Sequence, residues 1–149
     1  MATSNTGGPR KQRSTSTNRF NADHCGTGFR IIQQIGDITA SVGTEAADVI
    51  IVTFQLKDMK GRNPSGRHIV YMAVHDAVFG TLATDSTFIG TPVATGTLIE
   101  EITTDKSCRA WTDADGTVSL SITDPGVDTF YVSCTVGDVT IVSGACTFA

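Results

Sequence analysis

The residues best suited to chemistry are three histidines, four cysteines and neighbouring acidic side chains. His68 and His75 lie seven positions apart in one apolar, alternating segment, and an odd spacing on a strand places two side chains on opposite faces. They therefore cannot easily share a metal ion, and we expect both at the surface or at a strand edge. Glu100 and Glu101 face opposite sides for the same reason and do not form the carboxylate pair of a glycosidase. We expect no catalytic, cofactor-binding or metal-binding residues.

The segment Asp113-x-Asp115-Gly116 has the residue types of a calcium loop but not the spacing of an EF-hand, in which glycine is sixth and a glutamate twelfth. It predicts a β-turn instead, with an aspartate accepting backbone N–H groups and Gly116 at positive φ. The neighbours His24 and Cys25 have no evident partner for metal binding. The sequence also lacks a nucleophile elbow and a glycine-rich phosphate loop before a helix.

The four cysteines are spaced by 83, 26 and 12 residues and form no C-x-x-C pair, which gives a zinc site little support. Two interpretations stay open. The thiols are reduced, with Cys134 packed as a small hydrophobic residue, or they form disulfides within or between chains once the protein has left a reducing cell. In the second case Cys25 is the best candidate for a tether between chains. The residues concerned are Cys25, Cys108, Cys134 and Cys146.

Charge is distributed unevenly along the 149 residues, whose formal net charge is -4. The first thirty residues hold five basic side chains and one acidic, and the rest hold six basic and fourteen acidic. A basic segment before an acidic domain favours an acidic protein partner, because arginine binds carboxylates through two hydrogen bonds. So few charges without interleaved aromatic residues make nucleic acid an unlikely partner. The predicted partner-binding residues are Arg10, Lys11, Arg13 and Arg19.

The sequence shows no signal peptide, since its first nineteen residues are polar, and no apolar run long enough to cross a membrane. We therefore expect a protein made in a cytoplasm and independent of membranes.

Strand patterns begin at Asp48. The stretch Val49–Asp58 alternates, with Ile50, Val52, Phe54 and Leu56 on one face. Further strands are expected at 68–76, 96–103, 107–112, 117–123, 129–136 and 139–148, with a long loop at 79–95 that contains a short strand near Phe88. Turn residues separate these segments, and no segment has a helical period. This spacing predicts an all-β, antiparallel immunoglobulin-like sandwich.

The domain division follows from the same contrast. Residues 1–47 are expected to form an extended, basic N-terminal arm, and residues 48–149 the sandwich. The almost purely polar first thirty residues cannot bury enough surface to order themselves alone. Residues 31–47 contain one apolar cluster, and they are either a first strand or a connector.

Two passages carry a resemblance to a known family. Trp111-Thr112-Asp113-Ala114-Asp115-Gly116-Thr117 leads into an alternating strand, and Gly126-Val127-Asp128-Thr129-Phe130 leads into an aromatic one. Together with the Lys57-Asp58-x-x-Gly61-x-x-Pro64 turn, they resemble the Ig-like domains of bacteria and phages, over about residues 48–149. The last residues, 142–149, are similar to the final strand of such domains in tailed-phage virion proteins.

The resemblance implies a structural role, with no catalytic or cofactor residue to carry over. A basic segment followed by one Ig-like domain is similar to capsid decoration proteins, whose N-terminal segment anchors to the shell. We therefore expect a phage virion protein that is made in the host cytoplasm, binds the major capsid protein or other virion proteins, and forms a homo-oligomer such as a trimer or ring.

Two alternatives remain from the sequence. The first is a neck, collar or tail accessory protein of the virion, which the sequence does not separate from a decoration protein. The second is a module that binds host surface glycans through aromatic side chains in the 79–95 loop and near Trp111.

Overall fold

Alternating apolar residues build the two strands at the centre of the molecule, β2 (Val49–Asp58) and β7 (Thr117–Thr123). Val52 pairs with Leu120 in an antiparallel ladder, and the apolar face of each strand is buried. This confirms the faces predicted for both strands. Ser119, on the opposite face of β7, is nevertheless buried; it pairs with Thr95 of the neighbouring strand β4, and its hydroxyl lies 2.9 Å from that of Thr53.

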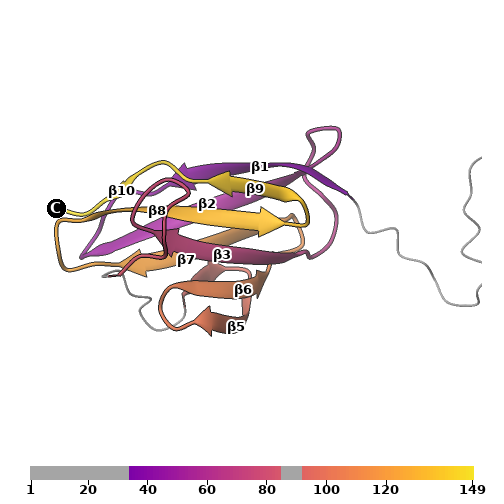
Figure 1. Ribbon diagram of the computed structural model, residues 1–149. Helices are drawn as coiled ribbons and strands as arrows, with labels where there is room; N and C mark the ends of the chain where they lie inside the picture. The colour runs from indigo at the N-terminus through magenta and orange to yellow at the C-terminus, as the bar shows by residue number, and fades with distance from the viewer. Residues whose placement is uncertain (1–33, 85–91) are drawn as a thin grey trace, which may run out of the picture. The chain divides into compact units, whose positions relative to one another are not determined.

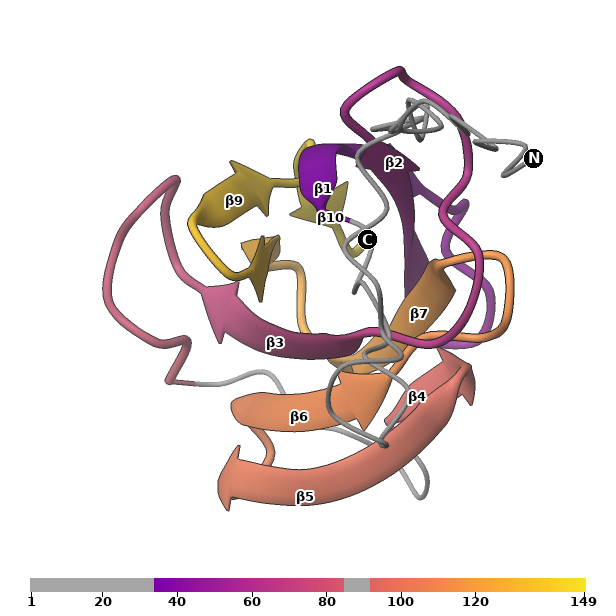
Figure 2. The same ribbon diagram turned by 90° about the vertical axis from the view of Figure 1, so that its right-hand side faces the viewer.

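The structure is a computed structural model that describes residues 34–84 and 92–149, within a compact unit that spans residues 33–149. Its strands form two antiparallel sheets that face each other (Figures 1 and 2). The first sheet has the order β1-β2-β7-β4, with β1 at Ile35–Val42 and β4 at Val93–Thr95. The second sheet has the order β5-β6-β3-β8, and both β9 and β10 pair with the remaining edge of β8. Its strands are β3 (Ile69–His75), β5 (Thr97–Thr103), β6 (Ser107–Trp111), β8 (Thr129–Val136), β9 (Val139–Val142) and β10 (Cys146–Thr147).

This arrangement is that of an immunoglobulin-like sandwich. The first sheet corresponds to strands A-B-E-D of a variable-type domain, and the second to G-F-C with two added strands beyond C. One feature departs from that plan: β4, in the position of strand D, precedes β5 and β6 in the chain instead of following them. The expected all-β fold class is therefore confirmed, with an altered connection.

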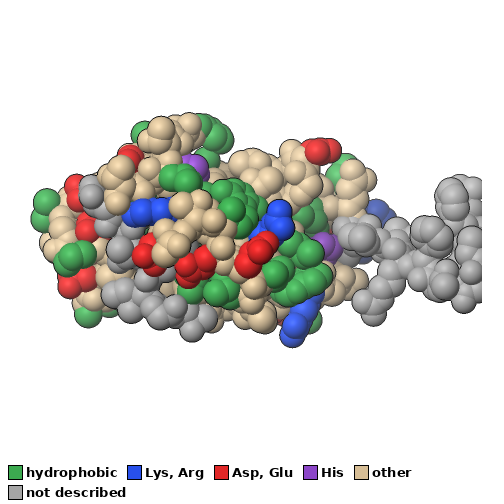
Figure 3. All heavy atoms as spheres, turned by 60° about the horizontal axis from the view of Figure 1, so that its bottom comes forward, with side chains coloured by type: hydrophobic (Ala, Val, Ile, Leu, Met, Phe, Trp, Pro, Cys, Tyr) green, Lys and Arg blue, Asp and Glu red, His purple; other side chains and the backbone are tan. Residues whose placement is uncertain are grey.

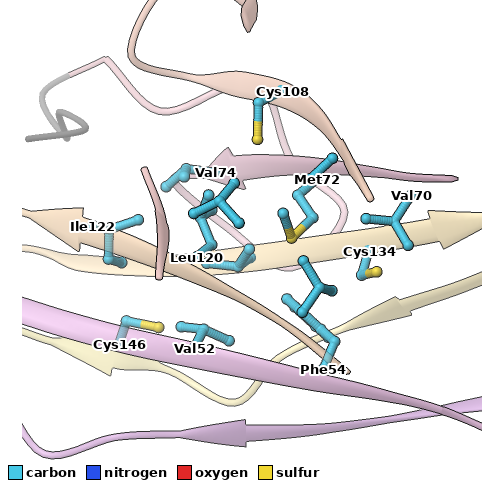
Figure 4. Packing of buried hydrophobic residues seen from close by; sticks show 14 of the residues in the cluster. Val52, Phe54, Val70, Met72, Val74, Cys108, Leu120, Ile122, Cys134 and Cys146 are labelled. Atoms are coloured by element: carbon cyan, nitrogen blue, oxygen red, sulfur yellow. The ribbon is translucent and has the colours of Figure 1, made fainter. Parts of the chain in front are cut away.

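The core lies between the sheets (Figure 4). Phe54, Leu120, Met72 and Val132 are each fully buried within it. Phe148, after β10, packs edge-to-face on Phe130, with ring centroids 6.0 Å apart. Aromatic pairs of this geometry add stability beyond the area that they bury.

The sandwich begins earlier than the boundary at Asp48. Of the two alternatives for residues 31–47, the structure shows a strand, because Ile35–Val42 pairs with β2 and buries Ile35 and Ile38. The last segment, expected as one strand over 139–148, is divided into β9 and β10. Between them the N–H of Ser143 donates to Val132 O (2.8 Å), and its hydroxyl oxygen accepts the Val132 N–H (3.0 Å).

One glycine allows the chain to move from the first sheet to the second. Gly96 alone separates β4 from β5, with φ at 98°. A Cβ atom at this position would collide with the carbonyl oxygen of Trp111. Glycine is therefore required here both by the left-handed backbone and by the close approach of β6.

Candidate protein-binding surface

The outward face of β3, β6 and β5 carries exposed apolar side chains. Antiparallel pairing places Ile69 beside Trp111 and Tyr71 beside Arg109. Ile69 is 49% exposed and Trp111 is 37% exposed, whereas the adjacent residue on each strand, Val70 and Ala110 respectively, is buried. The period of two along each strand therefore turns one set of side chains to the core and the other to solvent.

An ion pair lies within this face. Arg109 Nη1 is 3.0 Å from Glu100 Oε1, and both side chains are about half exposed. An exposed pair of this kind contributes little to stability, about 0–1 kcal/mol, but it holds a guanidinium group next to Tyr71 in the register. Glu101 instead pairs with Cys108, which is buried, so the two glutamates face opposite sides as expected.

Strand β5 forms the edge of the second sheet, and its outer backbone groups face no described strand. Its register with β6 shifts twice, between Leu98 and Glu100 and between Glu101 and Thr103. Ile99 and Ile102, at these two bulges, are 42% and 48% exposed. Bulges and acidic side chains on an edge strand hinder indiscriminate pairing with other sheets, so the exposed isoleucines of this strand favour a selective contact.

We call this set of side chains the β3–β6–β5 surface. Figure 3 shows hydrophobic side chains gathered on the side of the molecule that carries β5 and β6, around acidic and basic groups. Four of the nine large hydrophobic side chains that are exposed in the described residues belong to it, so it concentrates apolar area on one side. Its residues are Ile69, Tyr71, Ile99, Glu100, Ile102, Arg109 and Trp111.

Sequence reasoning missed this surface. The alternation Arg109-Ala110-Trp111 was a usable signal, because it marks Arg109 and Trp111 as sharing a face. The two bulges in β5 had no such signal, since they break the period of two on which the prediction depends.

Both histidines of the second sheet have defined positions, and they lie apart at the two ends of β3. His75 Nδ1 is 3.0 Å from Gly80 O, and its Nε2 is 2.8 Å from Ser133 Oγ. These contacts tie the loop after β3 to β8. The Ser133 hydroxyl belongs to a side chain only 7% exposed, which leaves little of it open to a substrate.

His68 corrects one expectation, because it is buried and not at the surface. Its N–H donates to Thr112 Oγ1 (3.0 Å), and the Thr112 N–H donates to its carbonyl oxygen (2.9 Å). These contacts extend the β3–β6 ladder by one residue, and His68 is only 7% exposed. Burial lowers the pKa of His68 below its ordinary value.

The aspartate-rich turn is confirmed as a β-turn. Asp113 Oδ1 accepts the N–H groups of Asp115 (3.0 Å) and Thr117 (2.8 Å), and Gly116 has φ at 77°. Asp58 acts similarly in the β2–β3 loop, where the backbone N–H of Arg62 is the main cause that holds its pKa below the usual range. These carboxylates serve the turns in which they lie.

Three cysteines are buried free thiols, on separate strands (Figure 4). Met72 lies between Cys108 and Cys134 in the register of the second sheet, which separates them by two strand spacings, or about 9–10 Å. Disulfides require Cα atoms within about 7 Å, so a disulfide within one chain is excluded for this pair. Cys146 pairs with Phe130, four residues along β8 from Cys134, which is also too far. Burial raises the pKa of Cys108 and Cys134 to about 12 and that of Cys146 to about 11.

Other predicted site residues lie outside the described part of the chain. They are Arg10, Lys11, Arg13, Arg19 and Cys25, together with the short strand expected near Phe88. Over residues 34–84 and 92–149, no three His, Cys, Asp or Glu side chains come together as metal ligands. The same ranges contain no helix that is long and apolar enough to cross a membrane.

Of the aromatic residues suggested for glycan binding, Phe79 and Trp111 lie in the described part of the chain, and these two do not form one platform. Phe79 is 74% exposed in the loop after β3, whereas Trp111 pairs with Ile69 at the start of β3. The length of β3, roughly 20 Å for seven residues, therefore lies between the two positions.

No protein-family model matches the sequence, and no curated protein matches it. A solved structure that resembles this chain is the D00-D0 domain of Intimin, with a TM-score of 0.42 and 14% sequence identity. The alignment covers 83% of this chain and 52% of that chain, so the protein spans about half of the Intimin structure. A likeness this distant carries no argument about function, and the immunoglobulin-like assignment depends on the strand order itself.

Proposed function

We propose that this chain is a structural protein of a phage virion that decorates the capsid, with its basic N-terminal segment as the anchor. The observation that carries the proposal is a basic segment followed by a sandwich with one apolar, edge-exposed face, the β3–β6–β5 surface. The resemblance to Ig-like domains of tailed-phage virion proteins supports the same role.

The composition of the β3–β6–β5 surface supports contact with protein. Tryptophan, tyrosine and arginine are the residues most enriched among energetic hot spots of protein interfaces. Here Trp111, Tyr71 and Arg109 lie on adjacent strands. In the proposed assembly, this surface contacts a neighbouring copy or another virion protein.

The basic segment supplies a contact of a different kind. Arg10, Lys11, Arg13 and Arg19 precede the acidic sandwich, and arginine forms paired hydrogen bonds with carboxylates. An acidic patch on the capsid shell is the proposed partner. Such a contact weakens with salt, because exposed charges are screened.

Co-sedimentation with capsids of the encoding phage tests the proposal. The full chain should sediment with capsids, and an Arg10→Gln, Lys11→Gln double variant should bind more weakly and with less dependence on salt. The matched control is Lys60→Gln, Arg67→Gln, which removes two exposed charges from the sandwich and should bind like the wild type. If the wild-type chain has no affinity for capsids, the proposal is wrong.

Copy number per particle separates decoration from the alternative position in the neck, collar or tail. A decoration protein is present in proportion to the capsid subunits, whereas a neck or tail protein matches one or a few rings. Quantitative gel electrophoresis of purified virions gives this number. A glycan array tests the remaining alternative, and binding that depends on Trp111 would favour it.

A further inference from the structure

The β7–β8 loop holds a buried carboxylate oxygen with no hydrogen-bond partner among the residues that the structure describes. Asp124, which follows β7, is only 4% exposed. Its Oδ1 accepts the Gly126 N–H (3.1 Å), but its Oδ2 is buried and has no hydrogen-bond partner within residues 34–84 and 92–149. A carboxylate oxygen removed from water without a partner is costly. Such an atom in a folded protein therefore calls for a bound ion or an ordered water that satisfies it.

A second carboxylate converges on the same place. If Gly126 carried a Cβ, that atom would lie 3.1 Å from Asp124 Oδ2, 3.2 Å from Asp124 Oδ1 and 3.3 Å from Asp128 Oδ2. Three carboxylate oxygens thus surround the position where any other residue would have a side chain. The φ angle of Gly126 lies outside the left-handed region, so backbone freedom does not explain this glycine. Its missing side chain does, because it leaves the space between the oxygens open.

Two other segments fix the loop in place. The Asp124 N–H donates to Asp48 O (3.1 Å), and the Phe148 N–H donates to Asp128 O (3.0 Å). The loop lies at the end of the sandwich where the last residues also lie (Figure 1), and acidic side chains are prominent at this end in Figure 3. The ion pairs Arg62–Asp58 and Arg109–Glu100 involve other carboxylates. The negative charge of Asp124 and Asp128 is thus not offset by those pairs.

We propose that the β7–β8 loop binds a calcium ion between the carboxylates of Asp124 and Asp128, beside Gly126. All the donors are oxygens, which selects a hard cation over zinc. Calcium accepts irregular sets of carboxylate, carbonyl and water ligands, whereas magnesium requires a near-octahedral set. With two carboxylates, and water completing the shell, the affinity belongs to the weak class, with Kd about 10⁻⁴–10⁻³ M. This inference does not depend on the proposed virion role.

The test is the melting temperature (Tm) of the chelator-treated full chain in CaCl2, MgCl2 and NaCl at matched ionic strength. Calorimetric titration of the same protein with calcium gives the Kd. Calcium should raise the Tm more than magnesium, and sodium should leave it nearly unchanged. No specific response to calcium in the wild type would overturn the proposal.

Variants then locate the ion. Gly126→Ala keeps every charge but places a methyl group among the three oxygens, so it should weaken calcium binding at least about tenfold. Asp128→Asn alters an exposed side chain, should not disturb folding, and should weaken binding similarly; Asp124→Asn removes the buried charge itself. The controls are Gly144→Ala, where a Cβ meets only an ordinary contact at 3.8 Å, and Asp138→Asn in the β8–β9 turn. Both controls should keep the wild-type response, and an equal response in all five variants would contradict this site.

Discussion

Strands β7 and β5 are both seven residues long, both begin and end with threonine, and both have isoleucine at the sixth position. Their environments are opposite. β7 lies inside the first sheet between β2 and β4, and Val118, Leu120 and Ile122 are fully buried. Among the described strands β5 pairs only with β6, and most of its side chains are exposed.

The difference shows that the neighbouring strands, more than its own composition, decide whether a strand contributes to the core or to the surface. β7 keeps strict alternation and so turns one continuous apolar face to the core. β5 has two glutamates in the middle and two bulges, which interrupt its alternation and leave it without a continuous buried apolar face. The first strand stabilises the fold, and the second is free to make contacts with other molecules.

The largest expected effect comes from truncating the central strand. Leu120→Ala leaves a cavity in the closed core and should lower the free energy of unfolding by about 2–5 kcal/mol. Ile102→Ala, in β5, removes a side chain that is 48% exposed and should change it by less than about 0.5 kcal/mol. Urea denaturation of both variants measures the contrast, and equal losses would show that β5 is part of the stabilising core.

The next effect tests Gly96, which connects β5 to β4, the neighbour of β7 in the first sheet. Gly96→Ala forces an L-residue to φ 98° and drives its Cβ against the Trp111 carbonyl. We expect a loss of at least about 1–2 kcal/mol in the free energy of unfolding, with the β5–β6 hairpin displaced. Amide hydrogen exchange should show faster exchange in β5 and β6 than in β7. Uniform acceleration across both sheets would mean that the two regions do not separate.

The smallest effect is a pH dependence at the junction of β3 and β6. Burial lowers the pKa of His68 in the folded state, so below the unfolded pKa of about 6.5 the unfolded chain binds the proton more readily. Stability due to neutral His68 is therefore fully present above that pH and is lost as pH falls through the window below it. Thermal melts between pH 7.5 and 5 should show a steeper decline for the wild type than for His68→Gln. Parallel declines would exclude His68 as the cause.

Sequence reasoning performs best where alternation is regular. The inward faces of β2, β3, β7 and β8 were all predicted, because Phe54, Met72, Leu120 and Val132 each lie in an uninterrupted period of two. The turn at Asp113 was also predicted, since aspartate and glycine have separate physical reasons to be there.

Other features were beyond sequence reasoning because they depend on contacts between distant segments. The β1–β2 turn has positive φ at Ala47 and Asp48, neither of which is the glycine or asparagine that usually marks such a turn. The backbone of buried His68 is held by Thr112, forty-four residues later. Likewise, nothing in the sequence around Gly126 indicates that two carboxylates converge on it, because that geometry appears only once the loop is folded.

The register between β2 and β7 has a consequence for how quickly the chain can fold. Val52 meets Leu120 and Met72 meets Cys134, so both sheets are closed by residues more than sixty positions apart. The β5–β6 and β8–β9 hairpins, by contrast, join residues that are close in sequence. Strand pairings between distant residues must overcome the entropic cost of closing long loops before they gain any contact energy. The hairpins should thus form early and the barrier should lie at the joining of β2 with β7, which predicts folding on the scale of milliseconds to seconds.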